Sequence, residues 1–379
     1  MKLVIAPDKF KGSLTAPEVA SRVAAGARAS LAAIEIVEIP VADGGEGTVD
    51  AALAAGFSRH EVDVAGPTGE TVTASLAVRG AEAVIEMAQA SGLDLLPGGV
   101  KDAAGATSRG TGELIRAALD VGCRRIVLAV GGSANTDGGA GLLLGLGAHL
   151  LDAAGAELPG GGAALAALDR IDLTGLDARL AGADLVLASD VDNPLLGPTG
   201  ASAVFGPQKG ATAADVERLD AALAHYVEVL DRDGGTLPVA ASVAAVAPGA
   251  GAAGGVGFAG LVLGAHRQSG IDVVIGFTGL ADHLAGADLV ITGEGSLDEQ
   301  SLMGKTPIGV ARAAQALGIP VHAVCGRTLL TDEQIAEAGF AGVHALAAVE
   351  PDPEVSMPNA GPLLERVAAG LVADVVRNG

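Results

Sequence analysis

Apolar and polar residues follow one another in short blocks that predict strands alternating with helices. The apolar run at residues 2–7 predicts a strand, and a helix is expected from Thr15, where Thr-Ala-Pro-Glu forms a capping box with proline in the first turn. Residues 34–42 predict a second strand, which ends in a glycine turn before a helix at residues 49–56. This β–α repeat is typical of a parallel sheet flanked by helices.

The pattern changes near residue 60. Residues 61–80 alternate apolar and polar positions around Gly-Pro-Thr-Gly, which predicts an antiparallel hairpin. From about residue 287 the strand–loop–helix rhythm returns, and it closes with an amphipathic helix at residues 361–379. The pattern therefore predicts two α/β domains, one built from both chain ends and interrupted by the other, with boundaries at 1–63 and 286–379 against 64–285.

Composition and charge limit the classes of binding partner that we expect for this protein. Half of the 379 residues are apolar and only 2% are aromatic, so the core is expected to consist of aliphatic side chains. The net charge of −22 disfavours nucleic acid and anionic membranes as partners. Two cysteines give neither a disulfide framework nor a zinc site. The start lacks a signal peptide, and the uncharged stretch 234–265 contains prolines and glycines that would break a membrane span, so we expect a cytoplasmic protein of undetermined oligomeric state.

Five glycine-rich loops are predicted at the carboxyl ends of strands, where parallel sheets bind ligands. Each loop carries an acid, a lysine or a hydroxyl residue, which is more than a turn requires. We expect the amides and hydroxyls of these loops to bind phosphate or substrate, with Gly44, Gly45, Gly131, Gly132 and Ser133 as candidates.

Lysine usage gives a sharper signal. Only six of the 23 basic residues are lysines, yet Lys9, Lys11, Lys209 and Lys305 all lie in loops with Gly, Ser or Thr. An ammonium is a compact charge that can follow a moving phosphoryl group, so we interpret these four as phosphate or substrate ligands. Ordinary loop exposure is the alternative.

Phosphoryl transfer also needs a divalent ion held by carboxylates and a base near the acceptor hydroxyl. The candidate Mg²⁺ ligands are Asp43, Asp190, Glu294 and Asp298, although capping a helix or turn explains any one of them equally well. Hydroxyl residues that could bind a small acid are Ser13, Thr107, Ser108 and Thr111. Arg109 could clamp its carboxylate, or could be a surface arginine.

Known nucleotide motifs fit poorly. Gly304-Lys-Thr306 ends like a P-loop, but Glu299 stands where its first glycine belongs. The dinucleotide fingerprint is incomplete at Gly293-Glu-Gly and weak at residues 248–255, so nicotinamide and flavin cofactors are unsupported.

Taken in order, the loop motifs resemble those of type I glycerate kinases. They include APDKFKGSLTA, ADGGEGT, GPTG, ATSRGTGELI, GGSANTDGGAG, DVDNPLLG, FGPQKGA and TGEGSLDEQSLMGKTPIGVA, and they span roughly residues 2–310. The chain departs from the family pattern in three places: residue 9 is often Ser, residues 134–137 often read Ala-Thr-Asn-Asp, and residue 109 is often aromatic.

The resemblance implies a flavodoxin-like domain with a second α/β domain inserted, and a kinase that uses MgATP to convert D-glycerate to 2-phospho-D-glycerate. Lys11, Asn193 and Lys209 occupy family-motif positions, and we take Asn193 as a binding residue and Lys11, Lys209 and Asp190, which directly follows a strand, as catalytic residues. Our hypothesis is that Asp190 orients or deprotonates the acceptor hydroxyl. A kinase of a related hydroxy acid, or a non-catalytic protein that binds a sugar acid or nucleotide, remains the alternative.

Overall fold

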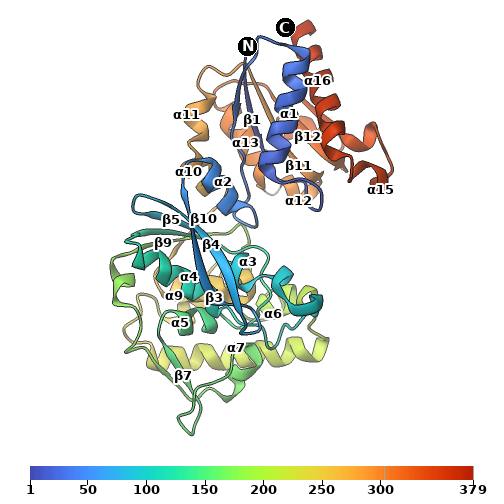
Figure 1. Ribbon diagram of the computed structural model, residues 1–379. Helices are drawn as coiled ribbons and strands as arrows, with labels where there is room; N and C mark the ends of the chain where they lie inside the picture. The colour runs from blue at the N-terminus through green and yellow to red at the C-terminus, as the bar shows by residue number, and fades with distance from the viewer. Residues whose placement is uncertain (303, 379) are drawn as a thin grey trace. The chain divides into compact units, whose positions relative to one another are not determined.

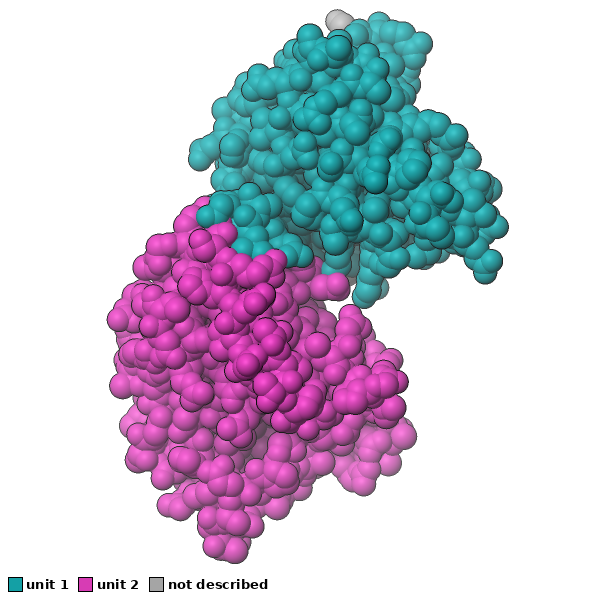
Figure 2. Space-filling model, in the orientation of Figure 1, with its two compact units in different colours: residues 1–43, 50–56, 270–379 teal, residues 44–49, 57–269 magenta. Residues whose placement is uncertain are grey.

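The computed structural model describes residues 1–302 and 304–378. Met303, inside one of the family-like motifs, and Gly379, inside the predicted last helix, lie outside the described residues. The chain forms two compact units, which Figure 2 shows in different colours. Unit 1 comprises residues 1–43, 50–56 and 270–379, and unit 2 comprises residues 44–49 and 57–269.

Unit 1 is built around a five-stranded parallel sheet with the strand order β13-β12-β11-β1-β2 (Figure 1). Its strands are β1 (Lys2–Pro7), β2 (Glu35–Glu38), β11 (Leu289–Leu297), β12 (Val321–Thr328) and β13 (Gly342–Ala345). Its helices are α1 (Ala16–Ser30), α10 (Gly270–Thr278), α11 (Leu280–Leu284), α12 (Glu299–Leu302), α13 (Thr306–Gln315), α14 (Asp332–Glu337), η7 (Leu346–Ala348), α15 (Pro353–Ser356) and α16 (Ala360–Asn378). A further helix, α2 (Thr48–Ala54), begins in unit 2 and ends in unit 1.

This strand order is the flavodoxin-like order 2-1-3-4-5, which confirms the predicted fold of the domain made by the two chain ends. The order reverses direction at β1, between its neighbours β2 and β11. Right-handed crossovers on the two sides of that reversal place α1 and α13 on opposite faces of the sheet. Ligands of such folds bind at the carboxyl ends of the strands beside the reversal.

Helices α1 and α16 lie side by side on unit 1 (Figure 1). The predicted capping box is present, since the Thr15 hydroxyl accepts from the amide of Glu18 and the Glu18 carboxylate accepts from the amide of Thr15. Gly26 permits the close approach of the two helices, because a Cβ there would lie 2.2 Å from the carbonyl oxygen of Glu365.

Unit 2 contains a six-stranded mixed sheet with the order β10-β9-β6-β5-β4-β3 and a separate β7–β8 pair. Its strands are β3 (Ser58–Ala65), β4 (Thr71–Arg79), β5 (Glu82–Glu86), β6 (Arg125–Ala129), β7 (His149–Leu151), β8 (Arg170–Asp172), β9 (Asp184–Ala188) and β10 (His266–Gln268). Its helices are α3 (Ala88–Ser91), η1 (Leu93–Leu95), η2 (Pro97–Gly99), α4 (Arg109–Asp120), α5 (Ala140–Gly145), η3 (Gly162–Ala167), η4 (Ala178–Gly182), α6 (Ala201–Phe205), η5 (Pro207–Lys209), α7 (Ala213–Asp233), α8 (Ala241–Ala245), η6 (Ala252–Gly255) and α9 (Val256–Val262).

The predicted hairpin is confirmed as β3 and β4, which pair antiparallel from Ser58 with Val78 to Ala65 with Thr71. Strands β5, β6, β9 and β10 run parallel to one another, and the carboxyl end of β3 lies at the same edge as theirs because two antiparallel pairings separate β3 from β5. The core is aliphatic, as the composition predicts, and includes the fully buried Val84, Val127 and Val186 from three neighbouring strands.

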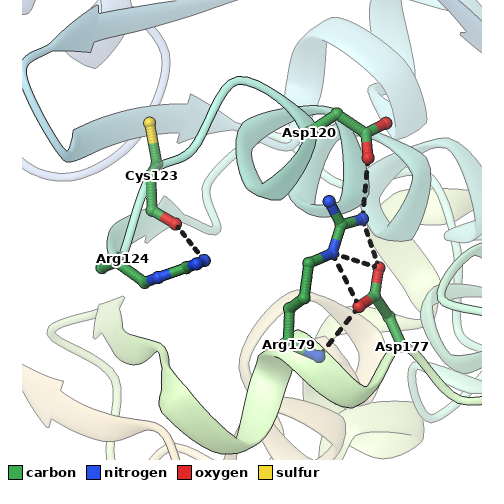
Figure 3. Close-up of polar contacts among 5 residues, drawn as sticks. All are labelled: Asp120, Cys123, Arg124, Asp177 and Arg179. Carbon is green, nitrogen blue, oxygen red and sulfur yellow. Dashed lines mark hydrogen bonds and ion pairs between the residues drawn. The ribbon is translucent and has the colours of Figure 1, made fainter.

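An arginine of the later η4 turn contacts the carboxyl end of helix α4 (Figure 3). The Arg179 guanidinium donates to Asp120, the last residue of α4, and to Asp177, which also caps η4. Nearby, the Arg124 guanidinium donates to the carbonyl oxygen of Cys123.

The compact units differ from the predicted domain boundaries. The boundary after residue 63 falls inside β3, whose whole length pairs with β4 in unit 2. Residues 270–285 form α10 and α11, which pack with α13 in unit 1. The division into folding domains at residues 63 and 285 stays a prediction.

The uncharged stretch 234–265 contains α8, η6 and α9 joined by turns. None of the described helices combines the length and apolar character that a bilayer crossing requires.

Candidate functional site

The carboxyl ends of β1 and β11, the two strands beside the reversal in unit 1, carry a group of carboxylates. Asp8 directly follows β1, and its amide donates to the carbonyl oxygen of Gly293 in β11 over 2.8 Å. Glu294 is the next residue of β11. The two acids therefore lie at the ligand-binding edge of the sheet.

The Asp8 carboxylate is tied to the start of α13. It accepts from the hydroxyl of Thr306 at 2.7 Å and from the amide of Lys9 at 2.7 Å. Burial and, to a smaller extent, the nearby Asp43 together raise the pKa of Asp8 to about 7, while the two hydrogen bonds oppose the shift. Asp8 is a member of this group that the predicted site did not include.

Glu294 lies in a similar environment. Burial raises its pKa to about 7, with additional repulsion from Asp298 and Asp43 and opposing contributions from Ser301 and Lys305. Its Oε1 atom is buried and has no hydrogen-bond partner among the described residues. Closely spaced carboxylates with an unsatisfied buried oxygen are a fit for a small divalent cation.

The set of possible metal ligands is small, however. Among residues 1–302 and 304–378, no three His, Cys, Asp or Glu side chains are grouped so that they could hold a metal ion. Three of the predicted Mg²⁺ ligands, Asp43, Glu294 and Asp298, belong to unit 1, whereas Asp190 belongs to unit 2. Mg²⁺ takes one or two protein carboxylates and completes its shell with water and phosphate, so the unit 1 acids fit it in that form.

The predicted phosphate or substrate ligands of unit 1 are three lysines and Ser13, and they lie in short connecting segments. Lys11 is exposed in a tight turn closed by hydrogen bonds from the amides of Ser13 and Leu14 to the carbonyl oxygen of Phe10. The Ser13 hydroxyl donates to the same carbonyl. Lys305 is the residue before α13 and is half-buried, and Lys9 is also half-buried.

In unit 2 a single buried carboxylate connects the glycine-rich loop after β6 with the loop before α4. Asp137 is completely buried. It accepts from the amide of Ser108 at 2.8 Å and the Ser108 hydroxyl at 2.9 Å, from the Asn135 side chain at 2.8 Å, and from the amides of Gly139 at 3.0 Å and Gly141 at 3.2 Å. Asp137 therefore joins the loop after β6 to the start of α4.

Lys209 lies beside this carboxylate and is 1% exposed. Its ammonium donates to the carbonyl oxygen of Asn135. Burial lowers the pKa of Lys209 to about 7, and Asp137 opposes that shift. Tyr226 is also buried here, and burial raises the pKa of its phenol. The short η5 turn carries the Lys209 side chain into the interior, so the alternative of ordinary loop exposure does not apply to Lys209, and its predicted role as a ligand stays a prediction.

The predicted hydroxyl ligands of unit 2 differ in accessibility. Ser108 is bonded to Asp137, and the Thr111 hydroxyl lies 2.9 Å from that of Ser91, so both have internal partners. The Thr107 hydroxyl accepts from the amide of Arg109. The Arg109 side chain is exposed and pairs with Glu113 at 3.0 Å.

The glycine positions reflect close backbone approach. A Cβ at Gly131 would lie 2.6 Å from the Cα of Gly45, and Gly44 and Gly132 have positive φ angles of 82° and 74°. Glu86, at the end of β5, accepts from the amides of Gly47 and Val49. Ser133 is buried and forms an isolated bridge with Gly92.

The loop after β9 presents Asp190, which is exposed. The Arg267 guanidinium donates to the carbonyl oxygen of Val191 and pairs with Asp192 at 2.5 Å. The Asn193 amide donates to the carbonyl oxygen of Thr199. Arg267, which the sequence did not single out, thus supports the loop that carries Asp190.

The structure gathers Asp43, Glu294, Asp298 and Lys305 around shared electrostatic interactions in unit 1, and Ser108 and Lys209 around Asp137 in unit 2. The catalytic or binding role of each predicted residue stays a prediction.

Sequence comparison gives the family. The profile of the Glycerate kinase family matches residues 3–376. The chain belongs to the glycerate kinase family. It is 48% identical over 354 residues to the glycerate 2-kinase of Escherichia coli K12, covering 92% of this chain and 90% of that protein. It is 43% identical over 379 residues to the glycerate kinase of Bacillus subtilis 168, covering 99% and 98%.

A solved structure agrees with this glycerate kinase family assignment. A crystal structure from Salmonella typhimurium LT2, provisionally described as glycerate kinase 2, matches with a TM-score of 0.85 and 42% identity over 100% of this chain and 99% of that one. The predicted family, the mixed α/β fold and the prediction of a kinase acting on glycerate are confirmed at the level of the family.

Proposed function

We propose that this member of the glycerate kinase family transfers the γ-phosphate of ATP to D-glycerate and forms 2-phospho-D-glycerate, in the cytoplasm. The observation that carries the proposal is the match of the family profile to residues 3–376. The relative from Escherichia coli, which is named a glycerate 2-kinase, supports the choice of the 2-phospho product. Mg²⁺ and ATP are the expected cofactor and phosphoryl donor.

In unit 1, Lys11 is proposed to contact the transferred phosphate, since its ammonium is exposed in a turn at the carboxyl end of β1. One or two of Asp43, Glu294 and Asp298 are proposed to ligate Mg²⁺, with water and phosphate oxygens completing its shell, and the bound ion would offset the charge of the phosphates. The unpartnered Oε1 atom of Glu294 supports this assignment.

In unit 2, Asp190 is proposed to accept the proton of the glycerate hydroxyl or to orient that hydroxyl. Its exposed position on a loop supported by Arg267 supports this role. Lys209 is proposed as a positioning residue rather than a phosphate ligand, because its ammonium is buried and bonded to Asn135. It would balance the charge of Asp137 and so keep the loop after β6 in place.

Product analysis tests the function. Purified protein is mixed with D-glycerate, ATP and Mg²⁺, and the product is detected with enolase, with and without added phosphoglycerate mutase. Signal with enolase alone is the expected result. Signal only with mutase would move the phosphate to the 3-position, and absence of signal in both would refute the proposal. A panel of related hydroxy acids separates glycerate from a neighbouring substrate.

Substitution of Asp190 tests its role. Asp190→Asn is expected to lower kcat by about 100-fold or more, the usual range for loss of a general base. Asp152→Asn, in a turn of the same unit where the side chain accepts from the amides of Ala154 and Ala156, is the matched control and should change kcat less than about five-fold. Turnover of Asp190→Asn within a few-fold of wild type would remove Asp190 from the mechanism.

A further inference from the structure

Unit 2 contains a pocket of about 540 Å³ that the proposed roles leave unused. It lies where β3 ends and α4 begins, which is the carboxyl edge of the unit 2 sheet. Its lining includes residues 67–69 of the Gly-Pro-Thr-Gly turn, one of the motifs to which no role has been given. The amide of Thr107 donates to the carbonyl oxygen of Pro67 at 2.8 Å, so this turn is tied to the loop before α4.

The pocket is too large for the acid substrate. Drug-sized ligands occupy pockets of about 300–1,000 Å³, and a three-carbon acid is much smaller than such ligands. Leu144 and Leu158, which are both half-buried, add apolar surface to a lining that is otherwise mostly polar. By size and surface the pocket suits a mostly polar ligand with a smaller apolar portion.

The charged side chains of the pocket lining further limit the class of ligand that the pocket can bind. The lining has one cation, Arg109, against three carboxylates, Asp63, Glu113 and Glu157, a net charge of −2. Arg109 is moreover paired with Glu113, whose other oxygen accepts from the amide of Ala65 at 2.7 Å. Such a lining disfavours a small carboxylate or a phosphate and favours a neutral group rich in hydroxyl donors.

We propose that this pocket receives the nucleoside portion of the nucleotide substrate. Ribose hydroxyls donate to the carboxylates of the lining, and the base lies on the apolar surface of Leu144 and Leu158. The inference rests on the proposed kinase function and adds to it the unit that binds the nucleoside. It also gives the Gly-Pro-Thr-Gly turn a role as one wall of the nucleoside pocket.

Cysteine labelling tests the proposal without turnover. Both native cysteines, Cys123 and Cys325, are fully buried. A cysteine introduced by Thr68→Cys would be exposed at the pocket wall, and its rate of reaction with a maleimide reports on occupancy. Val243→Cys, at a position that is 60% exposed and outside the pocket, is the matched control.

Saturating adenosine or ATP is expected to slow labelling of Thr68→Cys at least about five-fold and to leave Val243→Cys unchanged. D-glycerate alone should slow neither. Protection by glycerate alone, or no protection by adenosine and ATP, would overturn the assignment of the pocket. Because adenosine carries no phosphate to transfer, this result is independent of whether the protein is a kinase.

Steady-state kinetics give a second test. A Cβ at Gly160 would lie 3.2 Å from the Cβ of Thr107, so Gly160→Leu directs a side chain toward the pocket wall. We expect the KM for ATP to rise at least about ten-fold and the KM for glycerate to stay within two-fold. Gly235→Leu, whose Cβ would meet no atom within 4 Å, is the matched control in the same unit.

An unchanged KM for ATP, or a rise in the KM for glycerate alone, would contradict the nucleoside assignment. Wild-type protein that turns over no substrate would refute the kinase function, while adenosine protection of Thr68→Cys would still decide the pocket. If Gly160→Leu fails to fold, the labelling result decides alone.

Discussion

Replacement of Asp137 by asparagine should destabilise unit 2 strongly. The substitution preserves shape but turns one of the two carboxylate oxygens into an NH₂ group. One oxygen now accepts from Asn135 and Gly139, and the other accepts from the amides of Ser108 and Gly141. Whichever way the new amide faces, two buried donors therefore lose their acceptor.

The expected loss of stability follows from these contacts. A buried donor left without its acceptor costs about 1–3 kcal/mol, so two such donors cost about 2–6 kcal/mol. Lys209 would in addition lose the nearby carboxylate that favours its charged form. These effects overlap, and we expect Asp137→Asn to lower the free energy of unfolding by about 4 kcal/mol.

Tyrosine fluorescence measures this effect in unit 2 alone. The chain has one tyrosine and no tryptophan, and that tyrosine is Tyr226, buried on α7. Urea unfolding followed by Tyr226 emission at pH 7 gives the free energy and the slope, and an unchanged slope would show that the change is one of stability.

Asp152→Asn provides the matched control. Asp152 is half-buried in a turn of the same unit, and one of its oxygens accepts from the amides of Ala154 and Ala156 at 2.9 Å each. An asparagine carbonyl can replace that oxygen, so the loss should stay below about 1 kcal/mol. A loss below about 1 kcal/mol for Asp137→Asn would refute the argument that this carboxylate organises the two loops.

Three further predictions concern phosphate binding, backbone space and pH. Lys11→Ala should lower kcat/KM about 100-fold while the urea midpoint stays unchanged, because the side chain is exposed; equal activity would remove it from the site. Gly139→Ala should destabilise unit 2 by more than about 2 kcal/mol, as measured by Tyr226 fluorescence, because its φ is 72° and the added methyl would lie 2.3 Å from a neighbouring side-chain carbon. Gly122→Ala is the control: its φ is 93° but the added methyl would lie in open space, so the expected cost is about 1 kcal/mol. Burial lowers the pKa of His322 to about 4, so acidification from pH 6.5 to pH 4 protonates this histidine in the unfolded chain before it does so in the folded protein. The free energy of unfolding, measured by circular dichroism, should therefore fall by about 1–2 kcal/mol over this range, after allowance for the partial exposure of the side chain. The fall should be less steep in His322→Gln.

Much of the fold was predictable because strand and helix patterns at the two ends are local. The capping box at Thr15, the hairpin around residues 66–69 and the strands at both ends could be identified from spacing alone. The reversal of strand order at β1 could not be identified from spacing, because the pairing of Leu3 with Leu289 joins residues far apart in sequence. Likewise, the pairing of β3 with β4 places the whole of β3 in unit 2, past the predicted boundary at residue 63.

The candidate site was predictable in residue type but less so in arrangement. Glycine-rich loops at strand ends signalled ligand binding, yet the contact of Asp137 with Ser108, 29 residues earlier, could not be seen from its own loop. A lysine between Gln208 and Gly210 suggests exposure, whereas the η5 turn buries Lys209. Arg267 lay in a three-residue strand with no motif to mark its contact with the Asp190 loop.

The pairing of β1 with β11 sets an order of events during synthesis. Residues 57–269 of unit 2 leave the ribosome as one continuous stretch, but Leu3 meets its partner Leu289 only after 286 further residues have been added. At about 5–20 residues per second this takes roughly 15–60 s. The first strand, with its apolar residues Leu3, Val4 and Ile5, therefore lacks one of its two neighbouring strands while unit 2 can already fold. The growing chain therefore has a period in which its amino-terminal end depends on chaperones or on local burial for protection from aggregation.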